Sequence, residues 1–241
     1  MVALALATSR EEGARLILAG LVLEGTRRVD KAGEPVAADA VLTVKSRSRF
    51  VSRGGDKLEA ALHHFDIDVA GAVALDAGCS TGGFTDCLLQ RGAAKVYAVD
   101  VGYGQFAWAL RQDPRVVLME RTNIRNVDPA GLLPPPNLVV ADLSFVSLGS
   151  ILPSLVRLAD PAAARFVLLV KPQFEVDAAD TERGVVVSED VRARAVAEAE
   201  EAVRGCGLTV EGVVESPLRG AEGNVEYLLA ARAEEGRKAK G

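Results

Sequence analysis

A glycine-rich segment flanked by apolar residues is the feature that most constrains how this chain can fold. It reads Leu75-Asp76-Ala77-Gly78-Cys79-Ser80-Thr81-Gly82-Gly83-Phe84 and continues an apolar run that begins at Ala72. The run predicts a strand, the glycines predict a tight loop, and the residues from Phe84 to Gln90 predict a helix. A strand, a glycine loop and a helix N-terminus in this order commonly bind nucleotide-like ligands.

The spacing of the glycines narrows the choice of ligand. The loop lacks the G-x-G-x-x-G pattern that holds the pyrophosphate of a dinucleotide. The acid Asp76 at the strand end suits a ligand with a cationic amino-acid end, such as S-adenosylmethionine (SAM). We therefore expect SAM as the cofactor and the transfer of a group, usually methyl, as the reaction. The loop residues expected to bind it are Gly78, Cys79, Ser80, Thr81, Gly82, Gly83 and Phe84, together with Asp76.

Strand-like and helix-like runs alternate through the rest of the chain. This alternation predicts an α/β fold of the Rossmann-like class, with a mostly parallel sheet covered by helices on both faces. Strands are predicted at Val73–Asp76, Val96–Asp100, Val116–Glu120, Leu138–Asp142, Phe166–Val170, Leu208–Val214 and Tyr227–Ala231. Helices are predicted at Leu58–Phe65, Phe84–Arg91, Gln105–Arg111, Leu148–Leu158 and Asp190–Gly205.

Polar residues follow several of these strands, at the edge where such sheets bind ligands. Asp100 lies 24 residues after Asp76, near the spacing at which an acid binds ribose hydroxyls. Capping of a loop is the alternative role for Asp100, and the glycine loop favours ribose binding. Asn123 follows the third strand and Asp142 ends the fourth, and both are cofactor-binding candidates.

Lys171 directly follows the fifth predicted strand and has two interpretations. Its stem can be buried while its ammonium reaches solvent. Alternatively it is catalytic, because a nearby sulfonium and a second lysine would favour the neutral amine. A neutral amine could take the proton from an attacking ribose hydroxyl. The spacing alone leaves both interpretations open.

The charge of the chain is unevenly distributed. The net charge is −5, yet residues 1–57 hold ten Lys or Arg and seven Asp or Glu, whereas residues 58–241 hold eighteen and twenty-six. A basic front end on an acidic body predicts a local phosphate-binding surface. A solvated linker is the alternative explanation.

Composition argues against several classes of protein. The three cysteines follow no pattern, so we expect reduced thiols in the cytoplasm and neither a disulfide nor a metal site. No uncharged apolar run reaches the length of a membrane helix. The apolar start lacks basic residues and leads directly into Arg10, so we predict no signal peptide and no membrane association.

Two domains are predicted. A helix over Ser9–Gly20 and short strands around Leu21–Leu23, Arg28–Val29 and Val41–Val44 form a module over residues 1–45. Residues 46–50 form a predicted linker, because the stretch Lys45–Arg49 is polar and basic, and residues 51–241 form the larger domain.

Several segments resemble the TlyA family of ribosomal-RNA 2′-O-methyltransferases, which are related to FtsJ and often called haemolysin A. The resemblance extends from residue 9 to about residue 232. It is carried by Ser52-Arg53-Gly54-Gly55-Asp56-Lys57-Leu58, Ser80-Thr81-Gly82-Gly83-Phe84-Thr85-Asp86, Asp100-Val101-Gly102-Tyr103-Gly104-Gln105, Asp142-Leu143-Ser144-Phe145-Val146-Ser147-Leu148, Val170-Lys171-Pro172-Gln173-Phe174-Glu175 and Gly223-Asn224-Val225-Glu226-Tyr227.

The resemblance implies a catalytic set of Lys57, Asp142, Lys171 and Glu226. In this scheme Lys171 is the base or the group that activates the hydroxyl. Lys57 and Glu226 position and polarise the reacting groups, while Asp142 orients Lys171 and contacts the methionine end of SAM. The implied substrate is cytidine in ribosomal RNA or ribosomal subunits, the large one and in some relatives also the small one.

Residues 9–44 resemble an S4 RNA-binding module whose first helix is largely missing, and Glu24 replaces its usual asparagine. RNA contacts are expected from basic residues and from one aromatic side chain that could stack on a flipped nucleotide, as Phe145 could too. These residues are Arg10, Lys31, Arg53, Tyr103, Arg121 and Arg125.

Three other functions compete with methyl transfer. A ribosome-assembly factor would bind RNA without catalysis and would tolerate loss of Lys171. A nicotinamide oxidoreductase is disfavoured by the glycine loop. A pore-forming haemolysin needs a membrane segment or a long exposed amphipathic one.

Overall fold

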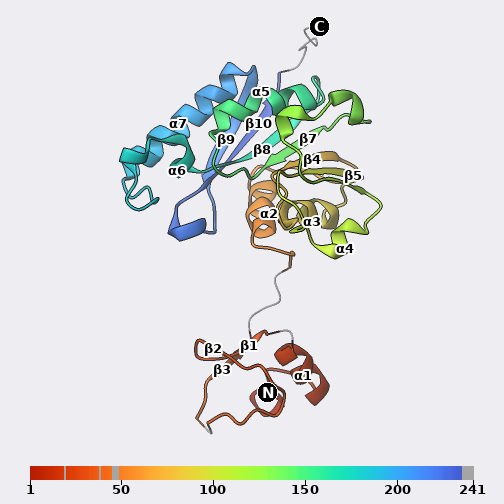
Figure 1. Ribbon diagram of the computed structural model, residues 1–241, viewed down its shortest axis with the longest axis vertical. Helices are drawn as coiled ribbons and strands as arrows, with labels where there is room; N and C mark the ends of the chain where they lie inside the picture. The colour runs from red at the N-terminus through yellow and green to blue at the C-terminus, as the bar shows by residue number, and fades with distance from the viewer. Residues whose placement is uncertain (19, 38, 45–48, 235–241) are drawn as a thin grey trace. The chain divides into compact units, whose positions relative to one another are not determined.

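The computed structural model describes residues 1–18, 20–37, 39–44 and 49–234. The chain divides into two compact units, Met1–Arg49 and Phe50–Gly241, and Figure 1 draws both. Most of the predicted linker, residues 46–48, lies outside the described residues.

Within its described residues, the first unit contains one α-helix and a small antiparallel sheet. The strand order in this sheet is β2-β1-β3. The Ser9 hydroxyl accepts a hydrogen bond from the Glu12 amide at 3.1 Å, and so it caps the start of the helix. The elements are η1 (Val2–Leu4), α1 (Arg10–Leu18), β1 (Val22–Glu24), β2 (Arg27–Arg28) and β3 (Leu42–Val44).

A seven-stranded sheet forms the centre of the second unit, with the order β6-β5-β4-β7-β8-β10-β9. The strands β4 to β8 pair in parallel, and β10 is antiparallel to both of its neighbours. The predicted mostly parallel α/β sheet is confirmed. The strands are β4 (Val73–Ala77), β5 (Lys95–Val99), β6 (Val116–Met119), β7 (Leu138–Ala141), β8 (Arg165–Val170), β9 (Leu208–Glu215) and β10 (Tyr227–Ala233).

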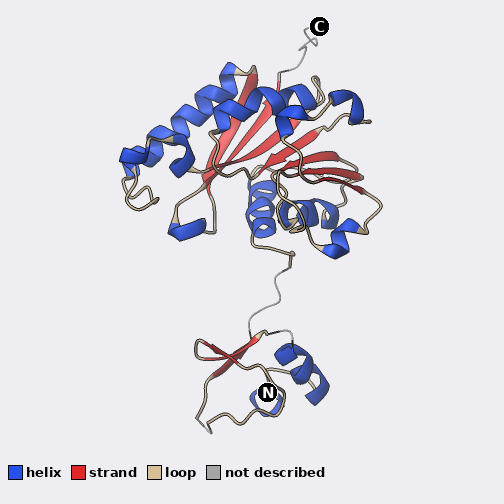
Figure 2. Cartoon of the chain, viewed as in Figure 1, coloured by secondary structure: helices blue, strands red, loops and turns tan. Residues whose placement is uncertain are grey.

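Helices cover both faces of this sheet, as Figure 2 shows. Leu75 and Ala77 share one buried cluster with residues of α5 and α7. Ala74 shares the opposite cluster with residues of α2 and α3, as the period of two in a strand requires. The helices are α2 (Gly54–His64), α3 (Gly83–Gln90), α4 (Trp108–Arg111), α5 (Leu148–Leu158), α6 (Pro172–Glu175) and α7 (Glu189–Gly205), with short 3₁₀ turns η2 (Ile124–Asn126), η3 (Pro129–Gly131), η4 (Ala178–Asp180) and η5 (Ala221–Gly223).

Two helix starts differ from the sequence prediction by more than one residue. Helix α2 begins at Gly54 rather than Leu58. The second of its two leading glycines is required by packing, since a Cβ on Gly55 would lie 2.3 Å from the Phe50 ring. Helix α4 is shorter than predicted and begins at Trp108.

Within the described residues, no helix is long and apolar enough to cross a membrane. In the same part of the chain, no cluster of His, Cys, Asp or Glu side chains could hold a metal ion. Cys79 and Cys87 are buried, and Cys206 is half-buried.

Candidate active site

The glycine loop between β4 and α3 lies tightly against the end of β7. Gly78 has a φ of 83°, and a Cβ on it would lie 2.4 Å from the Asp142 carbonyl oxygen. Only glycine fits this left-handed backbone and this close approach. The next turn is fixed by the Ser80 amide, which donates to Asp100 Oδ2 at 2.7 Å.

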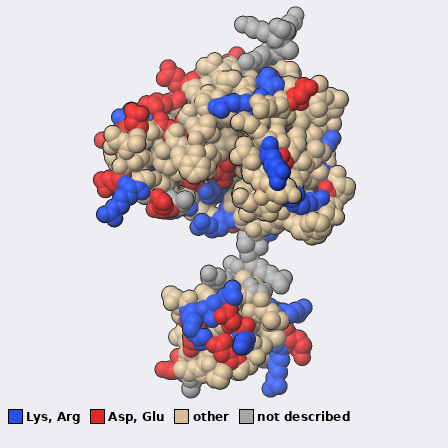
Figure 3. Space-filling view, viewed as in Figure 1, with Lys and Arg blue, Asp and Glu red and all other residues tan. Residues whose placement is uncertain are grey.

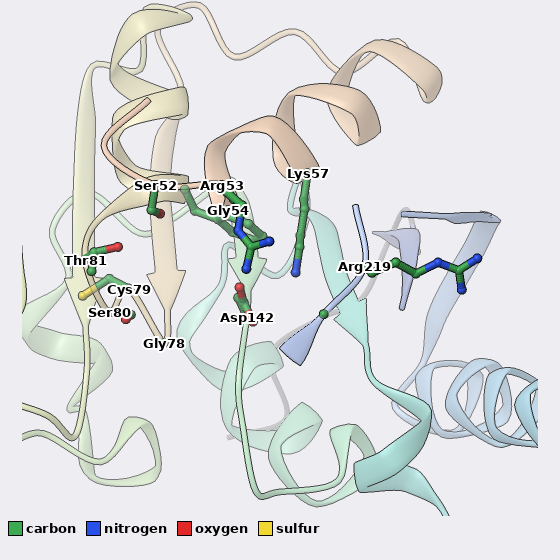
Figure 4. Close-up of a pocket in the computed structure, with 13 residues that line it drawn as sticks. Ser52, Arg53, Gly54, Lys57, Gly78, Cys79, Ser80, Thr81, Asp142 and Arg219 are labelled. Carbon is green, nitrogen blue, oxygen red and sulfur yellow. The ribbon is translucent and has the colours of Figure 1, made fainter. Parts of the chain in front are cut away.

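A cavity of about 230 Å³ opens beside this loop. Figure 4 shows the side chains of Arg53, Lys57 and Asp142 converging there, while that of Arg219 points away from them. Most of the predicted loop residues lie on its wall. The lining consists of Ser52, Arg53, Gly54, Lys57, Gly78, Cys79, Ser80, Thr81, Gly83, Phe84, Asp142, Arg219 and Gly220.

Asp76 lies beneath the loop and does not line the cavity. It is fully buried, and Thr85 Oγ1 donates to its Oδ2 at 2.6 Å. Among the described residues, Oδ1 has no hydrogen-bond partner. Burial raises the pKa of this carboxyl to about 7, and the nearby carboxylates of Asp142 and Asp100 add to that rise while Thr85 opposes it.

Two further predicted cofactor residues also lie off the cavity wall. Both Asp100 oxygens accept backbone hydrogen bonds, from Ser80 and from the Gly102 amide at 2.6 Å. Asp100 therefore caps the loops, and the remaining lone pairs of its oxygens can still accept a ribose hydroxyl. Asn123 is exposed, and its Oδ1 accepts from the Arg125 amide at 3.0 Å. Gly82 is the one predicted loop residue that does not line the cavity. It packs under Leu110 and Phe106.

The four residues of the implied catalytic set form two ion pairs. Lys171 Nζ lies 2.7 Å from Asp142 Oδ1 and donates to Ser144 Oγ at 2.9 Å. Lys57 Nζ pairs with Glu226 Oε2. Lys57, Lys171 and Glu226 are all buried, and buried charges need such partners.

The sheet brings the two pairs to one edge. Tyr227 of β10 lies opposite Val170 of β8, so the next residues along, Glu226 and Lys171, leave the sheet at the same edge. Lys57 and Asp142 line the cavity directly, and Lys171 is connected to it through Asp142.

Close packing of two helix starts sets the position of Lys57. A Cβ on Gly83 at the start of α3 would lie 2.2 Å from Ser52 Oγ and 3.0 Å from the Gly55 amide nitrogen. Because Gly83 lacks a side chain, α2 approaches α3 closely and carries Lys57 over the glycine loop.

Sequence reasoning missed four residues that line the cavity, namely Ser52, Gly54, Arg219 and Gly220. A Cβ on Gly220 would lie 2.1 Å from Glu226 Oε1, so this glycine leaves room for the buried carboxylate. The glycine precedes the G-N-x-E segment by three residues, and no pattern in the sequence distinguishes it from an ordinary turn.

Glu175 has a structural task that the sequence did not predict. Its Oε1 accepts from the Leu148 amide at the start of α5, at 2.8 Å. Burial raises the pKa of this carboxyl, and the Leu148 amide partly opposes the rise.

The residues expected to contact RNA fall into separate places. Arg53 lines the cavity. The Arg121 guanidinium lies 4.0 Å from the centre of the exposed Tyr103 ring. Arg125 is held against α5, where it donates to the Ser150 carbonyl and hydroxyl oxygens.

Arg10 and Lys31 are exposed in the first unit. Figure 3 shows basic and acidic side chains intermixed on this unit. Arg27 pairs there with Glu24 and Glu34, and Arg28 pairs with Asp30.

The sheet order and the cavity at its carboxyl edge define a Rossmann-like, SAM-dependent type of methyltransferase fold. The solved structure of magnesium protoporphyrin IX methyltransferase from Synechocystis, with bound SAH, matches this fold with a TM-score of 0.55 at 17% identity, over 76% of this chain and 82% of that one. Residues 50–233 match the model of the FtsJ-like methyltransferases.

The chain belongs to the FtsJ-like methyltransferase family and, within it, to the TlyA group. It is 50% identical to the 16S/23S rRNA (cytidine-2′-O)-methyltransferase TlyA of Mycobacterium tuberculosis, over 95% of this chain and 86% of that protein. A structure described as that of a hemolysin from Streptococcus thermophilus is 38% identical, with a TM-score of 0.77, over 96% of this chain and 86% of that one.

Proposed function

We propose that this protein transfers a methyl group from SAM to the 2′-hydroxyl of a cytidine in ribosomal RNA. The large ribosomal subunit is the expected substrate, and the small ribosomal subunit is a second candidate. The arrangement of the two ion pairs, Lys57 with Glu226 and Lys171 with Asp142, beside the glycine-loop cavity is the observation that carries this proposal. The name of the mycobacterial relative supports the choice of nucleotide.

The cavity residues fit SAM in their chemistry. The Asp142 carboxylate on the wall suits the cationic amino-acid end of the ligand, and the glycine loop gives backbone access to it. Asp76 would act from beneath the loop, and Asp100 would hold the ribose. SAM, when bound, supplies an electrophilic methyl group.

The residues of the chain would then align and activate the hydroxyl. Lys171 Nζ removes or polarises the proton of the 2′-hydroxyl, and Asp142 orients that amine. Lys57 and Glu226 fix the ribose on the cavity side. Most of the rate gain would come from holding oxygen and methyl in line.

The first unit would supply RNA affinity as an S4-like module, through Arg10 and Lys31. On the larger unit, Arg53, Tyr103, Arg121 and Arg125 would contact the RNA near the reacting nucleotide. Because ribosomal subunits are the substrate, the cytoplasm is the proposed location.

Transfer of labelled methyl from SAM to purified large and small ribosomal subunits tests this function, with Lys171→Ala as the matched variant. We expect label in ribose, and its loss with the variant. If no label enters the RNA although the protein binds the subunit measurably, the non-catalytic assembly factor would be favoured.

The same preparation tests the two remaining alternatives. Displacement of SAM by a nicotinamide dinucleotide would favour an oxidoreductase. Lysis of erythrocytes by the purified protein without SAM would favour a haemolysin.

A further inference from the structure

Trp108 is the only tryptophan in the sequence, and its side chain is 75% exposed. An indole is a large apolar ring that is highly buried on average. Neither the proposed chemistry nor the core uses this side chain. An exposed ring of this size beside a candidate active site is available for a contact with a partner, and tryptophan is enriched at such interfaces.

The helix that carries Trp108 is fixed to the cofactor loop. The Ala107 amide, one residue before it, donates to the Thr81 carbonyl oxygen at 3.1 Å. On the buried side of α4, Leu110 packs so closely on Gly82 that a Cβ there would lie 2.5 Å from Leu110 Cδ1. The backbone that carries the indole is therefore held at a fixed place beside the loop.

A hydrogen-bonded network connects α4 to the neighbouring rim. Glu120 pairs with Arg111 of α4 and also accepts from the Gly104 amide at 2.7 Å. Trp108 and Arg111 lie three residues apart and share a helix face. The network thus connects α4, which carries Trp108, to the loop that carries Tyr103.

The chemistry of this rim matches single-stranded RNA. Tyr103 is 64% exposed and lies under the Arg121 guanidinium. Exposed aromatic rings next to an arginine are the combination that stacks unpaired bases and neutralises their phosphates. Trp108 does not line the cofactor cavity, so SAM is a poorer match than RNA.

We propose that Trp108 stacks on an unpaired base of the ribosomal RNA close to the nucleotide that is methylated. This inference rests on the proposed function and adds one contact to it. Trp108 is here a positioning residue for the substrate, and it takes no part in the methyl transfer itself.

The first test is steady-state methylation of ribosomal subunits by the full chain. For Trp108→Ala we expect the KM for the subunit to rise about tenfold, the loss typical of one stacked base. The kcat and the Kd for SAM should stay unchanged, and Trp108→Phe should recover most of the affinity. Val187→Ala, another exposed apolar truncation in the same unit, is the control and should behave as the wild type.

A second test uses the single tryptophan as a reporter. The chain is produced with 5-hydroxytryptophan, which can be excited where the ordinary tryptophans of ribosomal proteins do not absorb. We expect the emission to be quenched by the ribosomal subunit that accepts the methyl group and to be unaffected by SAM alone.

The outcomes separate the inference from the function. Normal methyl transfer with unquenched emission, or an unchanged KM for Trp108→Ala, would overturn the stacking contact and leave the methyltransferase standing. Quenching by SAM alone would make Trp108 part of the cofactor site instead. Absence of methyl transfer to both subunits would overturn the proposed function and this inference with it.

Discussion

Asp76 is a buried acid whose protonation should be visible in the stability of the protein. Its pKa in the folded protein is raised to about 7, whereas the pKa of an exposed Asp is about 3.9. Between these values the native state holds a proton that the unfolded chain has lost. The free energy of unfolding should therefore fall as the pH rises from about 4 to about 7 and stay level above that.

We expect Asp76→Asn to remove this part of the pH dependence. The difference in unfolding free energy, variant minus wild type, should rise through the same window, as measured by urea unfolding without SAM. Thr85→Val removes the hydroxyl that favours the carboxylate, and so it should extend the fall to higher pH. Parallel curves for Asp76→Asn and wild type would show that Asp76 is already ionised below this window.

Gly220 provides a second prediction at this scale. In Gly220→Ala the new Cβ would displace Glu226 from its place beside Lys57. We expect methyl transfer to fall about 100-fold, because misplacement of a catalytic set by about 1 Å has effects of that size. Gly205→Ala is the control, since a Cβ there meets nothing within 4 Å. Equal activity of both variants would contradict a role for Glu226.

Asp76 and Gly220 differ in how much of their role a local sequence pattern can predict. A carboxylate after an apolar strand is recognisable in the sequence, and its place under the loop follows only from the alternation of β4, which turns Asp76 toward α3. Gly220 carries no such pattern. Its role depends on a side chain six residues later that folds back on it.

At the scale of elements, the site depends on α2 and β10, which lie at opposite ends of the larger unit in sequence. Lys57 and Glu226 are 169 residues apart and pair only because α2 packs near β10. Replacing one member leaves a buried charge without its partner, which costs about 3–5 kcal/mol.

The double variant Lys57→Met/Glu226→Leu should therefore separate stability from chemistry. We expect each single change to lower the free energy of unfolding by about 3 kcal/mol or more, and the double variant to recover most of that loss. None of the three should transfer methyl. Restored activity in the double variant would show that this pair has no role in the reaction.

The sequence predicts the strands of the sheet well because each is a short apolar run bounded by polar residues. It predicts the start of α2 poorly. Gly54 and Gly55 are weak helix formers, and what requires Gly55, its close packing on Phe50, is a tertiary contact. The direction of β10 is also beyond local patterns, because strand polarity depends on the path of the chain.

At the scale of the molecule, the two units should divide the work between RNA affinity and chemistry. Arg10 and Lys31 are exposed, and the double variant Arg10→Glu/Lys31→Glu should weaken binding to ribosomal subunits. The slope of log affinity against log salt should drop by about 1 to 2. Binding of SAM, which depends on the larger unit, should be unaffected.

Arg204→Glu serves as the control for that measurement. Arg204 is exposed on α7 and pairs with Glu200, and it lies in the unit to which the cofactor residues belong. We expect the slope of log affinity against log salt for Arg204→Glu to match that of the wild type. A similar loss in both variants would mean that overall charge, rather than the first unit, governs affinity for the subunit.

The pairing of Lys57 with Glu226 also has a consequence for the order of synthesis. A growing chain exposes α2 and the glycine loop well before Glu226, which lies 169 residues after Lys57, is synthesised. Until then Lys57 lacks its carboxylate partner, and the proposed catalytic set has three members. We therefore expect a nascent chain without Glu226 to be inactive on the ribosome that makes it.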